Sequence, residues 1–136
     1  MKLLNGPEFR RLESAISAAE MRQRVVANNV ANADTPKFKR SEVLFESLLE
    51  QSMGSGAPQL AGFRSDPRHF VIGSSGTTPR AKVVTDQLSV MNNNVNNVDI
   101  DREMSLLAKN QLNYNFYIGQ VNHQVKMMRT GIEGRG

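Results

Sequence analysis

Few side chains in this sequence are of the types that perform catalysis. The two histidines, His69 and His123, stand in unrelated surroundings, and the chain has no cysteine. A histidine acts as a general base only when its reaction partner lies within hydrogen-bond reach. Without cysteine there is neither a thiolate nucleophile nor a disulfide. We interpret His69 as a turn or packing residue and His123 as an exposed residue or one that contacts another subunit.

Three acidic residues resemble part of a calcium site. Asp99, Asp101 and Glu103 are spaced like the opening of a calcium-binding loop, but Met104 stands where that loop needs glycine. We interpret these acids instead as residues that complement the positive end of a helix dipole. Residues 73–76 lack the lysine and the serine or threonine of a phosphate-binding loop. The sequence therefore predicts no catalytic, metal or cofactor site, and no enzyme.

The charge distribution does not favour nucleic acid as a partner. The formal net charge is +4, but basic residues alternate with acidic ones along the chain. The densest basic run, at residues 37–40, contains one aromatic residue and is followed by Glu42 and Glu46. A nucleic-acid interface needs basic side chains gathered on one face. No stretch approaches the roughly 20 apolar residues of a membrane span, and no cleavable signal peptide is predicted.

An apolar stripe near the N-terminus predicts the first helix. Steps of three and four residues alternate along it, which gives the period of about 3.5 residues that is typical of a coiled-coil seam. Pro7 suits a first helical turn, and Pro36 disfavours helical geometry in the residue before it. We expect a helix over residues 7–32 with the assembly seam Phe9, Leu12, Ile16, Ala19, Gln23, Val26 and Val30.

A second stripe with the same spacing predicts a helix near the C-terminus. It is expected over residues 99–130, with Gly131 and Gly134 ending it. Asn92–Asn97 precede it, and asparagine favours turns and helix caps. The predicted seam consists of Ile100, Met104, Leu107, Gln111, Tyr114, Ile118, Val121, Val125 and Met128.

The middle of the chain is predicted to be irregular. Residues 38–53 suit either a short helix or an extended arm that folds back on the first helix. The segments 54–58 and 73–79 are rich in glycine, serine, threonine and proline, which favours loops, and 70–72 and 83–84 are the candidate strands. The division is therefore 1–36, an N-terminal assembly helix and motif; 37–98, an irregular middle segment; and 99–136, a C-terminal assembly helix.

These elements predict a mainly α fold. The two long helices would form an antiparallel, coiled-coil-like pair, with an irregular loop or short β-hairpin between them. Each stripe contains one polar residue, and we predict that Gln23 and Gln111 lie level, with Val30 opposite Met104. Only 39% of residues are hydrophobic and 6% aromatic, so an isolated chain should be marginally stable. An uncovered seam should become ordered against neighbouring molecules.

Residues 27–39, with the sequence ANNVANADTPKFK, resemble the N-terminal signature of bacterial flagellar rod, hook and hook-associated proteins. The stretch 96–104 and the residues 107–110 and Tyr114 are similar to the C-terminal region of proximal-rod members of that family. Lys37 stands where many relatives carry glycine, so the sequence does not predict a positive φ there. The motif residues are Asn28, Asn29, Ala31, Asn32, Asp34, Thr35 and Pro36, of which the asparagines suit intersubunit or helix-terminating hydrogen bonds.

The resemblance implies a structural component of the flagellar basal-body rod, the helical drive shaft that transmits torque and surrounds the export channel. It implies a periplasmic location and export through the flagellar type III apparatus. The implied partners are copies of this chain, rod proteins of the FlgC and FlgF types, the FliE-type rod adaptor and the FliF-type membrane ring protein. The heptads alone would equally suit a soluble coiled-coil adaptor or an export chaperone.

Overall fold

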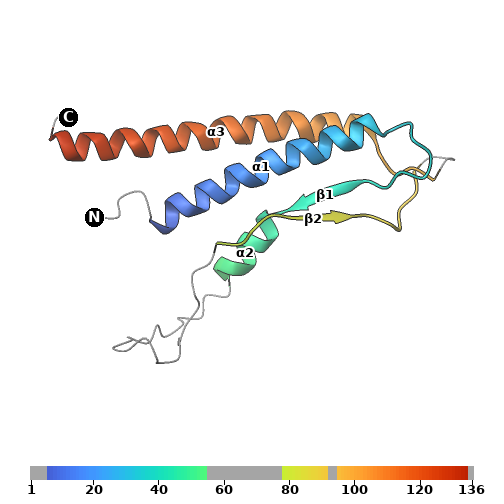
Figure 1. The fold of residues 1–136 in the computed structure, drawn as a ribbon, viewed down its shortest axis with the longest axis horizontal. Helices are drawn as coiled ribbons and strands as arrows, with labels where there is room; N and C mark the ends of the chain where they lie inside the picture. The colour runs from blue at the N-terminus through green and yellow to red at the C-terminus, as the bar shows by residue number, and fades with distance from the viewer. Residues whose placement is uncertain (1–5, 55–77, 92–94, 135–136) are drawn as a thin grey trace, which may run out of the picture.

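The computed structural model describes residues 6–54, 78–91 and 95–134. Two long helices, α1 (Pro7–Ala31) and α3 (Ile100–Glu133), pack against each other in antiparallel orientation. Between them in the sequence come β1 (Ser41–Leu44), α2 (Glu46–Gly54) and β2 (Lys82–Thr85). The predicted fold class is therefore confirmed: the protein is mainly helical, with a small sheet in its middle segment (Figure 1).

The helix ends follow local chemistry. Pro7 occupies the first turn of α1, and the Asp99 carboxylate caps α3 by accepting bonds from Asp101 N at 3.0 Å and Arg102 N at 3.2 Å. The expected end at Gly131 is wrong, because α3 continues to Glu133. Gly134 ends it with a φ of 64°, a left-handed conformation that glycine adopts without steric cost.

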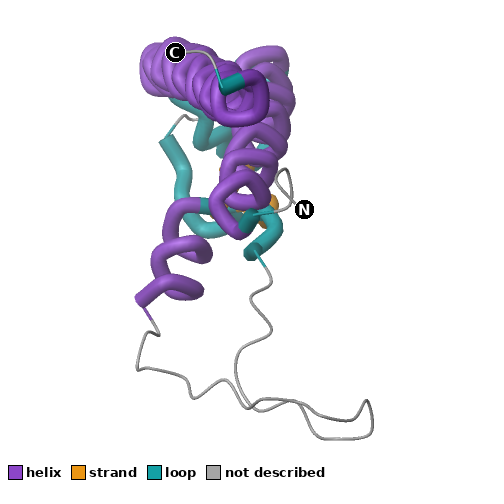
Figure 2. Tube along the Cα trace, turned by 90° about the vertical axis from the view of Figure 1, so that its left-hand side faces the viewer, coloured by secondary structure: helices purple, strands orange, loops and turns teal. Residues whose placement is uncertain are grey.

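The middle segment contains both of the structures that the sequence left open. Residues 41–44 form a strand that pairs with β2, with Ser41 opposite Thr85, and residues 46–54 form α2. The candidate strand at 83–84 lies within β2, whereas the one at 70–72 lies outside the described residues. Figures 1 and 2 show α1 between α3 on one side and the β1–α2 arm on the other.

A small apolar core joins this arm to the helices. Ala15 and Ala18 of α1 pack with Phe45, which is 3% exposed. Leu49, Ala81 and Tyr117 complete the cluster from α2, the residue before β2, and α3. The small alanine side chains let other elements approach the α1 backbone. Because this core is small, polar contacts contribute a large share of the order between elements.

The turn after α1 corrects the expectation for Lys37. Its φ is 63°, so this residue adopts the left-handed conformation even though it is not glycine. Val95, just before the buried Asn96, has a φ of 66°. A left-handed conformation brings Cβ close to the following carbonyl oxygen, and a β-branched residue tolerates it poorly. Contacts with the rest of the fold must therefore keep Lys37 and Val95 in the left-handed conformation.

Replacing Val95 by glycine is expected to raise the free energy of unfolding by about 1 kcal/mol, because relief of strain exceeds the added freedom of the unfolded chain. Val95 is 43% exposed, so little packing is lost. Val90→Gly is the control, since Val90 is also exposed and has no positive φ. Urea unfolding followed by circular dichroism measures both, and equal behaviour of the two variants would contradict the strain assignment.

Candidate assembly surface and its buried polar network

A buried polar network holds the end of α1, the start of α3 and β1 together. Glu103 is 0% exposed. Its carboxylate accepts one bond from Arg40 Nε at 2.5 Å and another from Asn29 Nδ2 at 3.0 Å. The Asn29 amide also pairs with the backbone of Ser41, donating to its carbonyl at 2.7 Å and accepting from its N–H at 3.0 Å. Asn29 thus holds β1 as a neighbouring strand would.

The ion pair at the centre of this network is well compensated. Arg40 also donates from Nη1 to Glu42 Oε2 at 2.9 Å. Burial by itself would lower the pKa of Arg40. The hydrogen bonds to Glu103 and Glu42, together with the negative charges of these two residues, outweigh burial and raise the pKa above its ordinary value. Arg40 therefore stays charged. A buried charge is tolerated when it is paired and hydrogen-bonded, and removal of one partner is strongly destabilising.

Asn96 closes the C-terminal end of α1. It is 0% exposed, and its Nδ2 lies 2.9, 2.8 and 2.9 Å from the carbonyl oxygens of Asn32, Ala33 and Thr35. Its Oδ1 accepts from Val98 N at 2.7 Å. These carbonyls lie in the turn after α1, where those of Asn32 and Thr35 also accept bonds from Thr35 N and Phe38 N. The segment before α3 therefore caps the segment after α1.

Asn97 extends the network to β2. Its Oδ1 accepts from Arg40 N at 2.6 Å, while its Nδ2 donates to Asp86 O at 3.0 Å and Ser89 Oγ at 2.9 Å. The Ser89 hydroxyl, then the backbone amides of Ser89 and Leu88, lower the pKa of Asp86 by donating to its carboxylate. That contribution to stability is present at neutral pH and is lost as the pH falls below the ordinary range of an aspartate.

The motif residues divide into an inner and an outer group. Asn29 is buried and Asn32 half-buried, and Asn32 donates from Nδ2 to the carbonyl of Asn28 at 2.8 Å. The structure brings these two into intramolecular bonds at the helix end. The exposed members are Asn28, Ala31, Asp34, Thr35 and Pro36.

The N-terminal seam lies partly inside the subunit. Ala19 and Val26 are buried, Gln23 is exposed, and Phe9, Leu12, Ile16 and Val30 are half-buried. Gln23 and Gln111 line the same hollow between α1 and α3, so the two glutamines lie close together.

The C-terminal seam splits into two sets. Leu107, Tyr114, Val121 and Met128 are half-buried, whereas Ile100, Met104, Gln111, Ile118 and Val125 are exposed. Asn29 of α1 meets Glu103 of α3, so the next residues, Val30 and Met104, lie at the same level of the helix pair, although the Met104 side chain is 51% exposed. Alternate members of the stripe thus lie at the edge of the helix pair, and the others face outward.

Sequence reasoning missed the polar residues that face inward. Glu103, Asn110 and Tyr117 recur every seven residues, parallel to the apolar stripe and adjacent to it. Asn110 is 1% exposed and donates from Nδ2 to the Ala19 carbonyl at 2.9 Å. This second seven-residue repeat is the sequence signal that could have identified the inward-facing polar residues of α3. Arg40, Asn96 and Asn97 had no comparable periodic signal, because their partners lie in distant segments.

An apolar surface remains uncovered on α3. Met104 and Val125 are 51% and 47% exposed, and Phe116, which packs edge-on against Tyr117, is 67% exposed. By helical spacing, Ile100, Met104, Ile118, Val125 and Ile132 share one side of α3, and such a row of exposed apolar side chains on a single chain typically marks an interaction site. The exposed large apolar residues of α3 are Ile100, Met104, Leu112, Phe116, Ile118, Val125, Met127 and Ile132.

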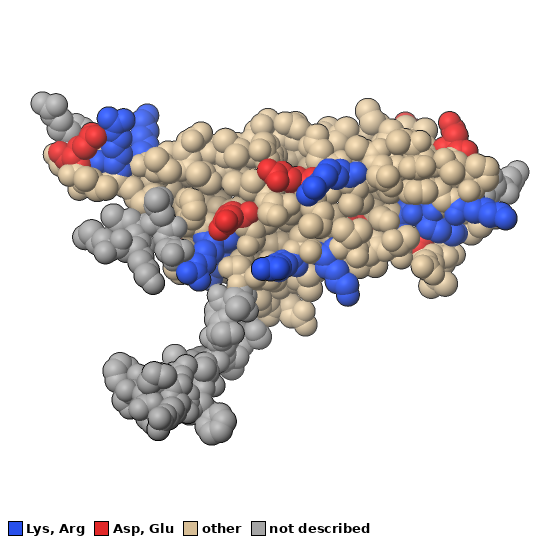
Figure 3. All heavy atoms as spheres, viewed as in Figure 1, with Lys and Arg blue, Asp and Glu red and all other residues tan. Residues whose placement is uncertain are grey.

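The remaining chemistry is sparse in the described part of the chain. His123 is exposed near Phe9, and His69 lies outside the described residues. Among residues 6–54, 78–91 and 95–134, no group of three or more His, Cys, Asp or Glu side chains is placed to hold a metal ion. No helix in those ranges is long and apolar enough to cross a membrane. On the face in Figure 3, basic side chains are interspersed with acidic ones.

The sequence is similar to known flagellar proteins. A model of the flagella basal body rod protein family matches residues 9–39, which include most of α1 and the turn after it. The flagellar basal body rod protein FlgB of Bacillus subtilis strain 168 is 35% identical over 134 residues, covering 98% of each chain. FlgB of Borreliella burgdorferi is 37% identical over 82% of this chain and 84% of the relative. FlgB of Escherichia coli K12 is 31% identical over 85% and 86%.

The paired helices with an exposed apolar face, together with the family match, define a structural protein of the bacterial flagellar basal body. Within that class, the alignments with FlgB proteins cover 82–98% of this chain, far more than the family model does, and they identify the particular family. The chain belongs to the FlgB family of flagellar basal body rod proteins.

Proposed function

We propose that this chain builds the rod as a helical drive shaft, transmitting torque and surrounding the export channel, and that its role is not enzymatic. The observation that carries the proposal is the apolar surface of α3, which the chain's own α1 leaves exposed. An apolar helix face exposed in one subunit is stabilised when a helix of another subunit covers it. Contacts of one surface with a different surface then generate a helical array.

The two helices take different parts in this assembly. In each, some seam residues stabilise the subunit and the others meet neighbours. Residues 1–36 and 99–136 are the assembly segments, and 37–98 is the middle segment that positions them. Two sets of seam residues meet neighbours: Phe9, Leu12, Ile16, Gln23 and Val30 of α1, and Ile100, Met104, Gln111, Ile118 and Val125 of α3. The exposed motif residues Asp34, Thr35 and Pro36 fix the exit of the chain from α1.

The proposed partners are other rod components. They comprise further copies of this chain, rod proteins of the FlgC and FlgF types, the FliE-type adaptor and the FliF-type ring protein. The proposed location is the periplasmic part of the basal body, reached through the flagellar type III apparatus. Membership of the FlgB family supports assembly with rod components in general.

Met104→Asp is expected to abolish rod assembly while leaving the subunit folded. Met104 is 51% exposed, so a carboxylate there remains hydrated in the free subunit and is buried only when a neighbour covers it. Complementation of a strain that lacks its own FlgB measures assembly through motility and isolated basal bodies. Circular dichroism and sedimentation of the purified variant measure its fold and its oligomeric state.

Ser105→Asp is the matched control, because it places the same charge on the next, exposed residue of α3. We expect this variant to support motility. Normal basal bodies with Met104→Asp would contradict the proposed seam. A stable wild-type dimer that does not associate with other rod proteins would instead favour the adaptor.

A further inference from the structure

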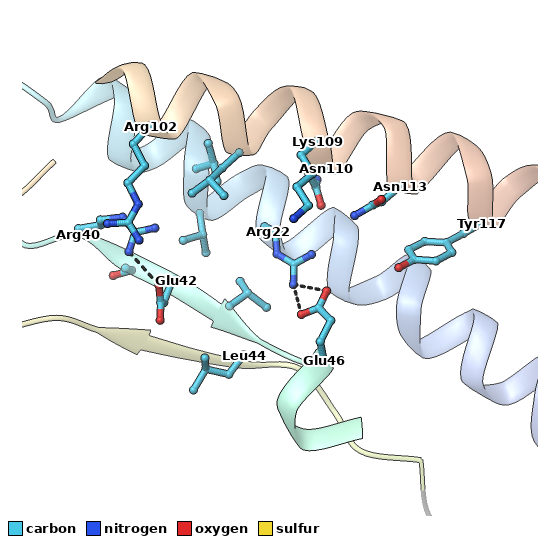
Figure 4. A pocket seen from close by; sticks show the side chains of 15 residues that line it. Arg22, Arg40, Glu42, Leu44, Glu46, Arg102, Lys109, Asn110, Asn113 and Tyr117 are labelled. Atoms are coloured by element: carbon cyan, nitrogen blue, oxygen red, sulfur yellow. Dashed lines mark hydrogen bonds and ion pairs between the residues drawn. The ribbon is translucent and has the colours of Figure 1, made fainter. Parts of the chain in front are cut away.

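A hollow lined by both charged and apolar side chains lies between α1, β1 and α3, beside the buried network. Its volume is about 430 Å³, within the range in which proteins hold ligands. Four cationic side chains line it, Arg22, Arg40, Arg102 and Lys109, against the two acids Glu42 and Glu46. Figure 4 shows these side chains around the hollow: Arg22 comes from α1, Arg102 and Lys109 from α3, Glu42 from β1, Glu46 from α2, and Arg40 from the residue before β1.

The cations of this hollow are not equally compensated. Arg22 binds Glu46 through two bonds of 2.7 and 2.6 Å, and Arg40 pairs with Glu103 and Glu42. Arg102 and Lys109 form no ion pair with any residue in the described part of the chain. The hollow therefore carries excess positive charge, and an additional carboxylate would relieve it.

A second observation points to an occupant. Asn110 lines the hollow, is 1% exposed, and its Oδ1 is a buried side-chain oxygen without a hydrogen-bond partner among the described residues. Its Nδ2 already donates to the Ala19 carbonyl, which fixes the orientation of the amide. Buried polar atoms in folded proteins are almost always bonded. Oδ1 therefore needs a donor, such as a backbone N–H.

We infer that the hollow receives an acidic side chain from a neighbouring rod subunit. Arg102 and Lys109 bind its carboxylate, and Asn113 and Tyr117, which also line the hollow one and two turns further along α3, offer donors to the rest of the same segment (Figure 4). A backbone N–H of the same segment donates to Asn110 Oδ1 once the side chains that cover this atom in the free subunit move aside. This contact gives the assembly a charge-specific register that an apolar seam alone cannot provide. The inference rests on the proposed function, because it needs a neighbouring subunit.

Zero-length crosslinking of isolated basal bodies tests it. A water-soluble carbodiimide condenses the Lys109 ammonium with a carboxylate in contact with it, forming an amide while the carbodiimide takes up the water lost. After proteolysis, mass spectrometry is expected to find Lys109 joined to an aspartate or glutamate outside its own hollow. Lys126, an exposed lysine of the same helix, is the internal control. Lys109 left uncoupled, or joined only to Glu42 or Glu46, would overturn the inference.

Charge variants give an independent readout. Combined Arg102→Glu and Lys109→Glu changes are expected to reduce incorporation into basal bodies at least tenfold, whereas Lys109→Arg and Lys126→Glu retain it. Normal incorporation of the double variant refutes the acidic occupant while leaving the proposed seam intact. Absence of the wild-type chain from basal bodies would instead refute the proposed function. Circular dichroism of the purified double variant excludes misfolding as the cause.

Discussion

Glu103→Gln is expected to lower the free energy of unfolding by about 3 kcal/mol. Arg40 Nε and Asn29 Nδ2 both donate to the carboxylate, one to each oxygen. A glutamine amide has one acceptor oxygen and one donor NH₂ group. Either Arg40 Nε or Asn29 Nδ2 would therefore face the glutamine NH₂, with no acceptor for its hydrogen. The change also removes a charge that compensates the buried Arg40. Urea unfolding in a buffer with trimethylamine oxide, which favours the folded state, measures the effect.

The same substitution at Glu133 provides the control. Glu133 accepts from Arg129 Nε at 2.8 Å, and both side chains are mostly exposed. An exposed ion pair one helical turn apart contributes about 0.5 kcal/mol or less. Equal losses for Glu103→Gln and Glu133→Gln would show that the buried pair does not hold the elements together.

Asn96→Asp should cost about 3 kcal/mol although it replaces only the NH₂ group with an oxygen. Three carbonyl oxygens now lie within hydrogen-bond distance of Nδ2 and share its two hydrogens. A carboxylate in that place donates nothing and repels all three. The loss should be smaller in acid, where a protonated carboxyl can donate one bond. Thermal unfolding at several pH values measures both effects.

Asn28→Asp is the matched control for that experiment. Asn28 lies in the last turn of the same helix and is exposed. A negative charge near a helix C-terminus is unfavourable by roughly 0.3–1 kcal/mol, and this cost is common to both variants. A loss for Asn96→Asp no larger than that of the control would remove Asn96 from its capping role.

Both long helices could be predicted closely from local signals. The apolar period, Pro7 and the Asp-Thr-Pro exit gave residues 7–32 for α1, which runs from Pro7 to Ala31. The second stripe gave 99–130 for α3, which runs from Ile100 to Glu133. Gly131 did not end that helix, because glycine within a helix costs only about 1 kcal/mol and the flanking residues continue it.

The rotation of α3 could not be predicted from the stripe. Hydrophobicity favours Met104 over Glu103 as the inward residue, and the opposite holds because Arg40 and Asn29 compensate the Glu103 carboxylate. Those partners lie 63 and 74 positions away in the sequence, beyond any local pattern. The positive φ of Lys37 was missed for a related reason, since Asn96 binds the carbonyls of the turn before it.

The long sequence separations within the polar network also determine when the fold can form. Asn29 meets Glu103 across 74 positions, and Asn110 meets Ala19 across 91. Such contacts give a high contact order, and closing a loop of this length costs entropy before any bond forms. Until residues 96–110 arrive, the polar groups that they satisfy at the end of α1 lack those partners. Under the proposed export route, a chain is therefore expected to stay unfolded for as long as residues 96–110 are kept apart from the end of α1.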